Sequence, residues 1–302
     1  MKVLLLYFSG TGNTAYIADR IRDSLIGYGH EARTWRYRQD KERDFDLAEC
    51  DLIGLGYPIH AFNAPEVFNS FVKSLPKGDK PYFVFKVSGE PFRLNDASSF
   101  IIVKNMKRKG YRLVGEKHFL MPYNIMFRYK DALAKQMALL APLLGDAYVK
   151  SLLLGEAPRI KHSLSKRLVS FIFRIEYLAP RLNAPFIRVR KEKCVDCHKC
   201  VDNCPTKAIE KWENGKYRFR ASSCSMCMNC AYSCPKDAIV FGFMNPWKVN
   251  GPFDYEGILN DPAIPATYVD EGRKGYFHLF LRYFRREGEF VNLYQGQSLD
   301  SK

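Results

Sequence analysis

Residues 3–14 read VLLLYFSGTGNT, and this stretch decides the fold of the first half of the chain. The run Val3–Phe8 is apolar and has the length of a buried parallel strand. The following segment, Ala15–Leu25, carries apolar side chains at helical spacing. A strand, a glycine-rich turn and a helix in this order direct backbone N–H groups at a phosphate. The polar side chains that the turn offers are the hydroxyls of Ser9, Thr11 and Thr14 and the amide of Asn13. The turn has no Lys or Arg, so it is not the loop of nucleoside-triphosphate enzymes.

Strand and helix patterns alternate through the first 155 residues, which predicts a doubly wound parallel sheet. The predicted strands lie near Lys2–Phe8, Glu31–Tyr37, Asp51–Tyr57, Tyr82–Val87 and Tyr111–Leu120. The predicted helices lie near Asn13–Ile26, Pro65–Ser74, Ala97–Lys109 and Lys130–Leu154. Pro142 should kink or split the last helix, because proline lacks the N–H that a helix interior needs.

From Leu5 to Ile21 the sequence resembles the FMN-phosphate signature of flavodoxins. The resemblance implies strand order 2-1-3-4-5, with FMN bound outside strands one and three. It implies phosphate contacts from Ser9, Gly10, Thr11, Gly12, Asn13 and Thr14. It also implies that two loops, residues 56–62 and 88–92, flank the flavin ring, with contacts from Tyr57, Pro58, His60, Phe62, Ser88, Gly89 and Glu90. The candidates to stack on the ring are Tyr57, His60, Phe62 and Phe92. Typical flavodoxins often keep a glycine in the first loop, whereas here it reads Pro58-Ile-His-Ala61.

Eight of the nine cysteines form two copies of one spacing, Cys-x2-Cys-x2-Cys-x3-Cys-Pro. The first copy runs from Cys194 to Cys204 and the second from Cys224 to Cys234. The sequences that follow, Pro205–Ile209 and Pro235–Ile239, are near-copies, which indicates an internal duplication. Zinc favours a single set of four ligands in two pairs, and disulfides would imply export, so neither explains two interleaved runs. The ninth cysteine, Cys50, is predicted to be a small buried residue.

The cysteine runs resemble those of bacterial ferredoxins, which bind two 4Fe–4S clusters. In that family the last cysteine of each run ligates the other cluster. The resemblance therefore implies one cluster on Cys194, Cys197, Cys200 and Cys234, and a second on Cys224, Cys227, Cys230 and Cys204.

Together the two resemblances are those of flavodoxin–ferredoxin fusions, the EFR-type iron–sulfur flavoproteins of anaerobes. We expect a flavodoxin-like domain over 1–155, a basic helical connector over 156–185, a small α+β ferredoxin domain over 186–241 and an aromatic-rich extension over 242–302. Ordered packing is expected of the extension, because disordered tails are poor in aromatic residues. No segment reads as a signal peptide or a membrane span, and thiolate clusters suit a reducing compartment, so we expect a cytoplasmic protein.

The net charge of +15 is densest in the connector. Residues 151–193 carry ten basic and three acidic side chains, and no nucleic-acid motif accompanies them. An acidic redox protein such as ferredoxin, or a partner reductase, is therefore the expected partner. Leu164, Leu168, Phe171, Ile172, Ile175 and Leu178 recur at helical spacing. We expect this apolar face to pack on the protein's own domains, and a contact with an anionic membrane is the alternative.

Three functions fit these features. The favoured one is an electron carrier that links low-potential donors to an acceptor through FMN and two 4Fe–4S clusters. The alternative is an FMN-dependent reductase of a quinone, nitro compound or activated alkene, with His60 or Tyr123 as candidate proton donors. A redox sensor is a third and weaker interpretation. The first two place the chain among the oxidoreductases in the broad sense.

Overall fold

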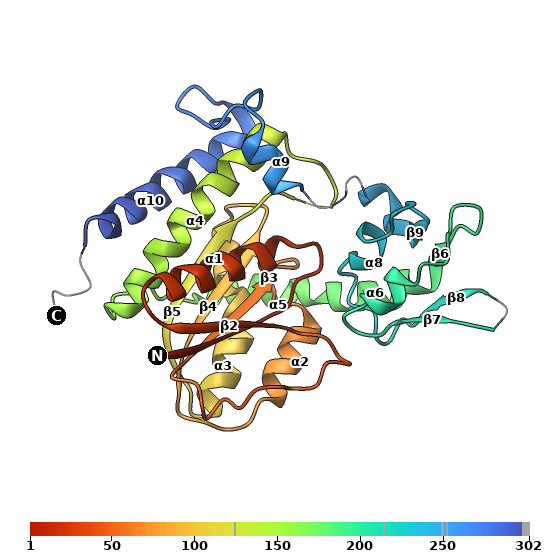
Figure 1. The fold of residues 1–302 in the computed structure, drawn as a ribbon, viewed down its shortest axis with the longest axis horizontal. Helices are drawn as coiled ribbons and strands as arrows, with labels where there is room; N and C mark the ends of the chain where they lie inside the picture. Colours follow the sequence, from red (N-terminus) through yellow and green to blue (C-terminus); the bar gives the residue numbers. More distant parts are fainter. Residues whose placement is uncertain (124, 214, 249–250, 252, 298–302) are drawn as a thin grey trace.

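The computed structural model describes residues 1–123, 125–213, 215–248, 251 and 253–297, and its first half is the predicted doubly wound sheet (Figure 1). Five parallel strands lie in the order β2-β1-β3-β4-β5, which confirms the predicted topology. They are β1 Lys2–Tyr7, β2 Glu31–Arg36, β3 Leu52–Pro58, β4 Pro81–Ser88 and β5 Arg112–Leu120. The inner strands are buried on both faces, which is why they read as continuous apolar runs.

Helices cover both faces of this sheet (Figure 1). One face carries α1 and α4, which pack against each other, and the other face carries α2 and α3. The helices are α1 Asn13–Gly27, α2 Glu66–Ser74, the 3-10 helix η1 Arg93–Ser99, α3 Phe100–Arg108 and α4 Asp131–Leu153. Helix α4 is continuous through Pro142, so of the two predicted effects of this proline, a kink or a split, the split does not occur.

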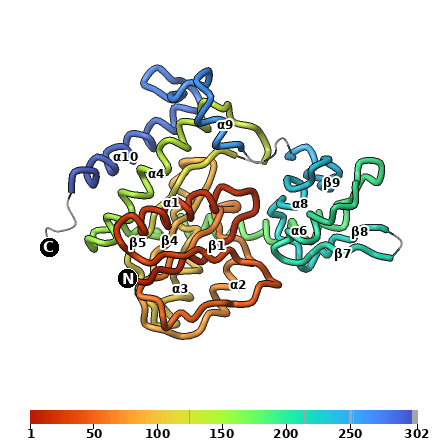
Figure 2. Tube along the Cα trace, viewed as in Figure 1, coloured from red at the N-terminus to blue at the C-terminus, as the bar shows by residue number. Residues whose placement is uncertain are grey.

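The C-terminal extension adds one more layer, on the outer side of α4. Its helices are α9 Tyr255–Asn260, the 3-10 helix η5 Gly275–Phe277 and α10 His278–Gln295. Figure 2 shows α10 running alongside α4, far from the cysteine-rich region. A buried ion pair of 2.5 Å joins Lys117 of β5 to Glu287 of α10. The extension is therefore part of the core packing of the first domain over its described residues, as its aromatic content predicted.

The connector is almost entirely helical, and it bridges the sheet and the cysteine-rich region as a green band in Figure 1. Its elements are α5 Leu164–Ile172, η2 Phe173–Leu178, α6 Ala179–Asn183 and η3 Ala184–Phe186. Pro180 and Pro185 each occupy a first-turn position of a short helix, where proline costs no hydrogen bond. None of the helices formed by the described residues combines the length and apolar character needed to cross a bilayer.

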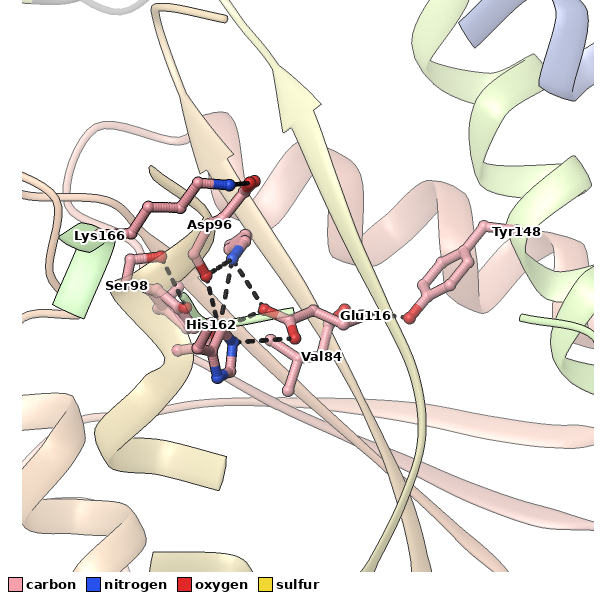
Figure 3. A network of polar contacts seen from close by, with 10 residues as sticks. Val84, Asp96, Ser98, Glu116, Tyr148, His162 and Lys166 are labelled. Carbon is pink, nitrogen blue, oxygen red and sulfur yellow. Dashed lines mark hydrogen bonds and ion pairs between the residues drawn. The ribbon is translucent and has the colours of Figure 1, made fainter. Parts of the chain in front are cut away.

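A buried polar network ties the connector to the sheet (Figure 3). Lys86 of β4 and Glu116 of β5 form a fully buried ion pair of 2.7 Å. His162, just before α5, lies 3.4 Å from the same carboxylate, and Lys166 of α5 bonds Asp96 at 2.5 Å. Burial by itself would raise the pKa of Glu116, but Lys86 and His162 outweigh it and hold that pKa at about 2.

The cysteine-rich region consists of two small two-stranded sheets and single-turn helices around its own small core. Strand β6 pairs antiparallel with β9, and β7 pairs antiparallel with β8. Its elements are β6 Ile187–Val189, α7 Lys199–Asp202, β7 Ile209–Lys211, β8 Tyr217–Phe219, α8 Asn229–Tyr232, β9 Ile239–Phe241 and the 3-10 helix η4 Gly242–Trp247.

Candidate functional site

The phosphate loop lies between β1 and α1, where the sequence predicted it. Gly12 precedes the helix with φ at 105°, a conformation that favours glycine. The Ser9 hydroxyl accepts a hydrogen bond from the Ala15 N–H at 3.3 Å. The Thr14 hydroxyl is buried and has no hydrogen-bond partner among the described residues. A buried unpaired hydroxyl at a helix N-terminus fits an anion, because it is costly unless a ligand completes it.

Asn13 differs from its expected role. Its side-chain amide donates to the Pro122 carbonyl at 2.8 Å, and its oxygen accepts from the Tyr255 hydroxyl at 2.7 Å. The side chain therefore anchors the C-terminal extension to the loop. Only its backbone N–H stays oriented for a phosphate, as the first residue of α1.

The phosphate loop lies directly against the second cysteine run. A Cβ atom at Gly10 would lie 2.4 Å from the Cys227 carbonyl oxygen, so only glycine permits this approach. Nearby, the Gln39 N–H donates to the Pro205 carbonyl at 2.8 Å, and Lys207 pairs with Asp40 at 2.7 Å. The cysteine-rich region is thus docked on the edge of the sheet where parallel-sheet proteins bind ligands.

The two loops predicted to flank the flavin ring, residues 56–62 and 88–92, are called the ring loops. A cavity of about 820 Å³ opens between these ring loops, the connector and the second cysteine run. This volume lies within the range of about 300–1,000 Å³ that is typical of small-molecule sites. The ring loops contribute His60, Phe62, Ser88, Gly89 and Glu90, as the resemblance implied. Further lining comes from Tyr123, Phe173, Glu176, Tyr177, Cys224, Met226 and Met228.

The first ring loop is held in a left-handed conformation. Ala61 and Phe62 have φ of 38° and 61°, and paired backbone hydrogen bonds between His60 and Asn63 close the turn. Ser170 of α5 donates to the Asn63 side chain at 2.7 Å, so the connector braces this loop. Burial lowers the pKa of His60 to about 4, and the imidazole is therefore neutral at pH 7.

The second ring loop is held by tyrosines. Glu90 accepts hydrogen bonds from the hydroxyls of Tyr276 at 2.7 Å and Tyr123 at 3.2 Å. A Cβ atom at Gly89 would lie 2.4 Å from the Tyr123 ring, so the ring packs flush against the loop backbone. Burial raises the pKa of Tyr123, and the neighbouring Glu90 raises it further. Tyr123 is thus a neutral phenol whose proton is directed at Glu90.

Three predicted ring contacts are not at the cavity. Tyr57 is fully buried under the sheet, where its hydroxyl bonds Ser98 at 3.1 Å and its ring contacts Phe68. Pro58 ends β3 and Phe92 precedes η1, and neither lines the cavity. The physical reason at Tyr57 is strand alternation, which places its side chain beside those of Ile53 and Leu55 in the core between the sheet and α2.

The cysteines of the two runs gather in the interleaved sets. Cys194, Cys197, Cys200 and Cys234 line one small cavity of about 20 Å³. Burial raises the pKa of Cys200 to about 11 and that of Cys224 to about 12. Cys204 lies close enough to Cys224 to raise its pKa further. Buried thiols that are costly to ionise fit iron, because cationic irons compensate the thiolate charges.

The duplication is visible in the backbone. Asp196, His198 and Lys207 have positive φ, and so do Met226, Met228 and Asp237, which lie 30 residues further on. The sulfurs of Cys204 and Cys234 each accept a backbone N–H, from Ala208 at 3.3 Å and Ala238 at 3.2 Å. Two loops that tolerate the same strain fit the same type of ligand. Among the described residues, no group of three or more His, Cys, Asp or Glu side chains is close enough together to hold a single metal ion.

The sequence did not identify the connector and extension residues of the site. Phe173 contacts Phe62 with ring centroids 4.9 Å apart, and Tyr276 reaches Glu90 from nearly 190 residues away. One signal was available for Glu176, which is the only acid between residues 157 and 191 of a basic segment. Burial raises the pKa of this carboxyl, and it lines the cavity.

Two family models match the chain. A flavodoxin domain matches residues 4–111, and a 4Fe–4S dicluster domain matches residues 193–238. No protein with a curated description matches the sequence.

Among solved structures, a flavodoxin from the domain Archaea is similar over 50% of this chain and 99% of its own, at 18% identity and a TM-score of 0.36. Oxidised Flavodoxin 2 from Bacillus cereus is similar over 40% of this chain and 84% of its own, at 25% identity and a TM-score of 0.34. Two-electron reduced Megasphaera elsdenii flavodoxin is similar over 39% of this chain and 85% of its own, at 25% identity and a TM-score of 0.33.

The two family matches lie on one chain and do not overlap. A flavodoxin domain followed by a 4Fe–4S dicluster domain makes this chain a flavodoxin–ferredoxin fusion, an electron-transfer protein whose domains imply FMN and iron–sulfur clusters.

Proposed function

We propose that the protein relays electrons between a low-potential donor and an acceptor, using one FMN and two 4Fe–4S clusters. When bound, flavin exchanges electrons singly or in pairs, whereas a cluster exchanges them singly. The single observation that carries the proposal is the cavity whose walls come from both ring loops and from Cys224 and Met226 of the second run. One cavity adjoining both kinds of site supports direct exchange between them.

The chain's residues have distinct tasks in this relay. Ser9, Thr14 and the α1 N-terminus would hold the FMN phosphate, and Gly10 lets the second run approach the same loop. Phe173 and Tyr177 of the connector exclude water from one side of the cavity. Cys197 of the first run is exposed, which supports this run as the entry point for electrons from a partner.

The donor is proposed to be an acidic redox protein such as ferredoxin. The net charge of +15 supports this, because a positive field steers an acidic partner and raises its association rate. Oxygen-sensitive thiolate clusters further support a reducing compartment such as the cytoplasm.

The test is anaerobic reconstitution followed by reduction with an acidic ferredoxin. Wild-type protein should hold about eight irons and one FMN. Cys204→Ala should lose about half of the iron, keep FMN, and lose rapid flavin reduction by ferredoxin. Cys50→Ala is the matched control, since Cys50 is buried in the first domain, and it should behave as wild type. Undiminished flavin reduction in Cys204→Ala would contradict a relay through the second run.

A second candidate is an FMN-dependent reductase of a small organic substrate, and the size of the cavity favours it. The two candidate proton donors, His60 and Tyr123, line this cavity. However, His60 is neutral at pH 7 and the Tyr123 proton is directed at Glu90, so neither is a strong acid. Catalytic turnover of a quinone, nitro compound or activated alkene by reduced protein would support the reductase. Reduced protein that stays reduced in the presence of these compounds would support the relay.

A further inference from the structure

Three polar side chains of the connector bond the first domain. Lys166 pairs with Asp96 at 2.5 Å, as Figure 3 shows, and Ser170 donates to Asn63 at 2.7 Å. Tyr177 donates to the Ala64 carbonyl at 2.7 Å. Amphipathic helices of globular proteins bury their apolar side, and this segment does the reverse.

The apolar side is consequently exposed. We name as the connector face Leu164, Leu168, Phe171, Ile175, Leu178 and Leu182. These residues are spaced alternately four and three apart, and each is between 47% and 76% exposed. The neighbouring rings of Phe186 and Phe243, 4.2 Å apart, are exposed as well. The expectation that this side packs on the protein's own domains is therefore wrong. A contiguous apolar stripe of this size marks an interaction surface.

Positive charge follows the connector face along one edge. Arg167, Arg174 and Arg181 each lie one residue before a member of the face, seven residues apart. Within the part of the chain that the structure describes, none of the three forms an ion pair. Arg167 lies over the Phe100 ring at 4.0 Å and remains exposed. Arg174 is half-buried, whereas Arg167 and Arg181 are exposed, and Arg181 also lines the cofactor cavity. The edge of the stripe thus offers two exposed cationic groups that no described carboxylate neutralises.

We propose that the connector face docks on an anionic lipid surface, with the helical segment 164–182 lying in the plane of the interface. Exposed leucine, isoleucine and phenylalanine side chains would enter the headgroup boundary, and the arginines would contact anionic headgroups. A second copy of the chain fits less well, because an antiparallel pairing would place one arginine edge against another without acidic partners.

Docking would place the cofactor cavity next to the membrane. The other side of the same segment contributes Phe173, Glu176 and Tyr177 to the cavity. The interaction surface itself depends on neither cofactor, and only this consequence rests on the proposed function.

The test is co-sedimentation of the anaerobically purified, full-length holoprotein with vesicles. Binding should occur to vesicles of mixed phosphatidylglycerol and phosphatidylcholine, weaken as salt rises, and be absent with phosphatidylcholine alone. The double substitution Phe171→Glu and Ile175→Glu should lower binding by about tenfold or more. Leu293→Glu is the matched control, because Leu293 is 58% exposed on α10, away from the connector, and it should leave binding unchanged.

Arg167→Gln separates charge from apolar contact, and it should weaken binding to anionic vesicles with flavin and iron contents intact. Failure of the wild-type protein to bind anionic vesicles would overturn the proposal, and so would equal binding to neutral vesicles. Self-association that the double substitution abolishes, without vesicle binding, would assign the face to a second copy and would overturn it too. None of these outcomes depends on electron transfer, so a failed relay and a failed docking surface are told apart.

Discussion

Gly10→Ala tests whether the phosphate loop and the second cysteine run are in direct contact. The added methyl group would lie 2.4 Å from the Cys227 carbonyl oxygen, whereas ordinary contact begins at about 3.4 Å. The two segments would have to separate by about 1 Å, and the obstacle is backbone that cannot rotate away. Overpacking of this kind costs about 1–3 kcal/mol. We therefore expect the thermal midpoint of the holoprotein to fall and flavin reduction through the clusters to slow.

Gly27→Ala is the control for this experiment. Gly27 ends the same helix, α1, and a Cβ atom there meets nothing within 4 Å. Alanine at Gly27 should leave stability and electron transfer unchanged or slightly improve stability, because alanine favours helix more than glycine does. Calorimetry and anaerobic stopped-flow absorbance would measure the two effects. If Gly10→Ala matched Gly27→Ala in both measurements, the direct contact between the domains would be refuted.

Three further predictions follow from buried polar groups. Thr14→Val should weaken FMN binding by about 1–3 kcal/mol and leave riboflavin binding almost unchanged, measured by flavin fluorescence, because it removes a donor to the phosphate alone. Glu116→Gln should lower the free energy of unfolding by about 3–5 kcal/mol in urea titrations, since it leaves the buried Lys86 without its carboxylate partner. Glu271→Gln, which removes the carboxylate of an exposed ion pair, is the control, and a smaller loss of stability for Glu116→Gln than for Glu271→Gln would contradict the prediction. The folded-state pKa of His60 is about 4, below its unfolded value of 6.5, so its contribution to stability is complete above pH 6.5 and is lost as pH falls toward 4. His60→Asn should make the thermal midpoint less dependent on pH between pH 6.5 and pH 4.

Local patterns were sufficient to predict the sheet and both ligand loops. The apolar runs of β1, β3 and β4, the Ser9–Thr14 turn and the repeated cysteine spacing each depend on neighbours in sequence. Such short-range signals survive without knowledge of tertiary structure. For that reason the positions of the strands and of the Ser9–Thr14 turn agree with the prediction, whereas the strand order was predicted from the resemblance to flavodoxins.

The failures arose where a partner far along the chain decides the outcome. The side of the connector that faces the protein is set by Asp96 and Asn63, and helical periodicity cannot say which side turns inward. The Asn13 side chain accepts a hydrogen bond from Tyr255, which lies 242 residues away in the sequence. The position of Tyr57 could have predicted its burial, because it still belongs to β3, an inner strand that is buried on both faces.

The cavity has a consequence for the order in which the protein matures. Its ring loops lie before residue 91, whereas the walls around Phe173 and Cys224 are synthesised later. The extension that packs on the first domain, and that bonds Asn13 through Tyr255, is synthesised last of all. Docking of the second cysteine run against Gly10 then adds one wall to the cavity. We expect bound flavin to exchange more slowly once that wall is in place.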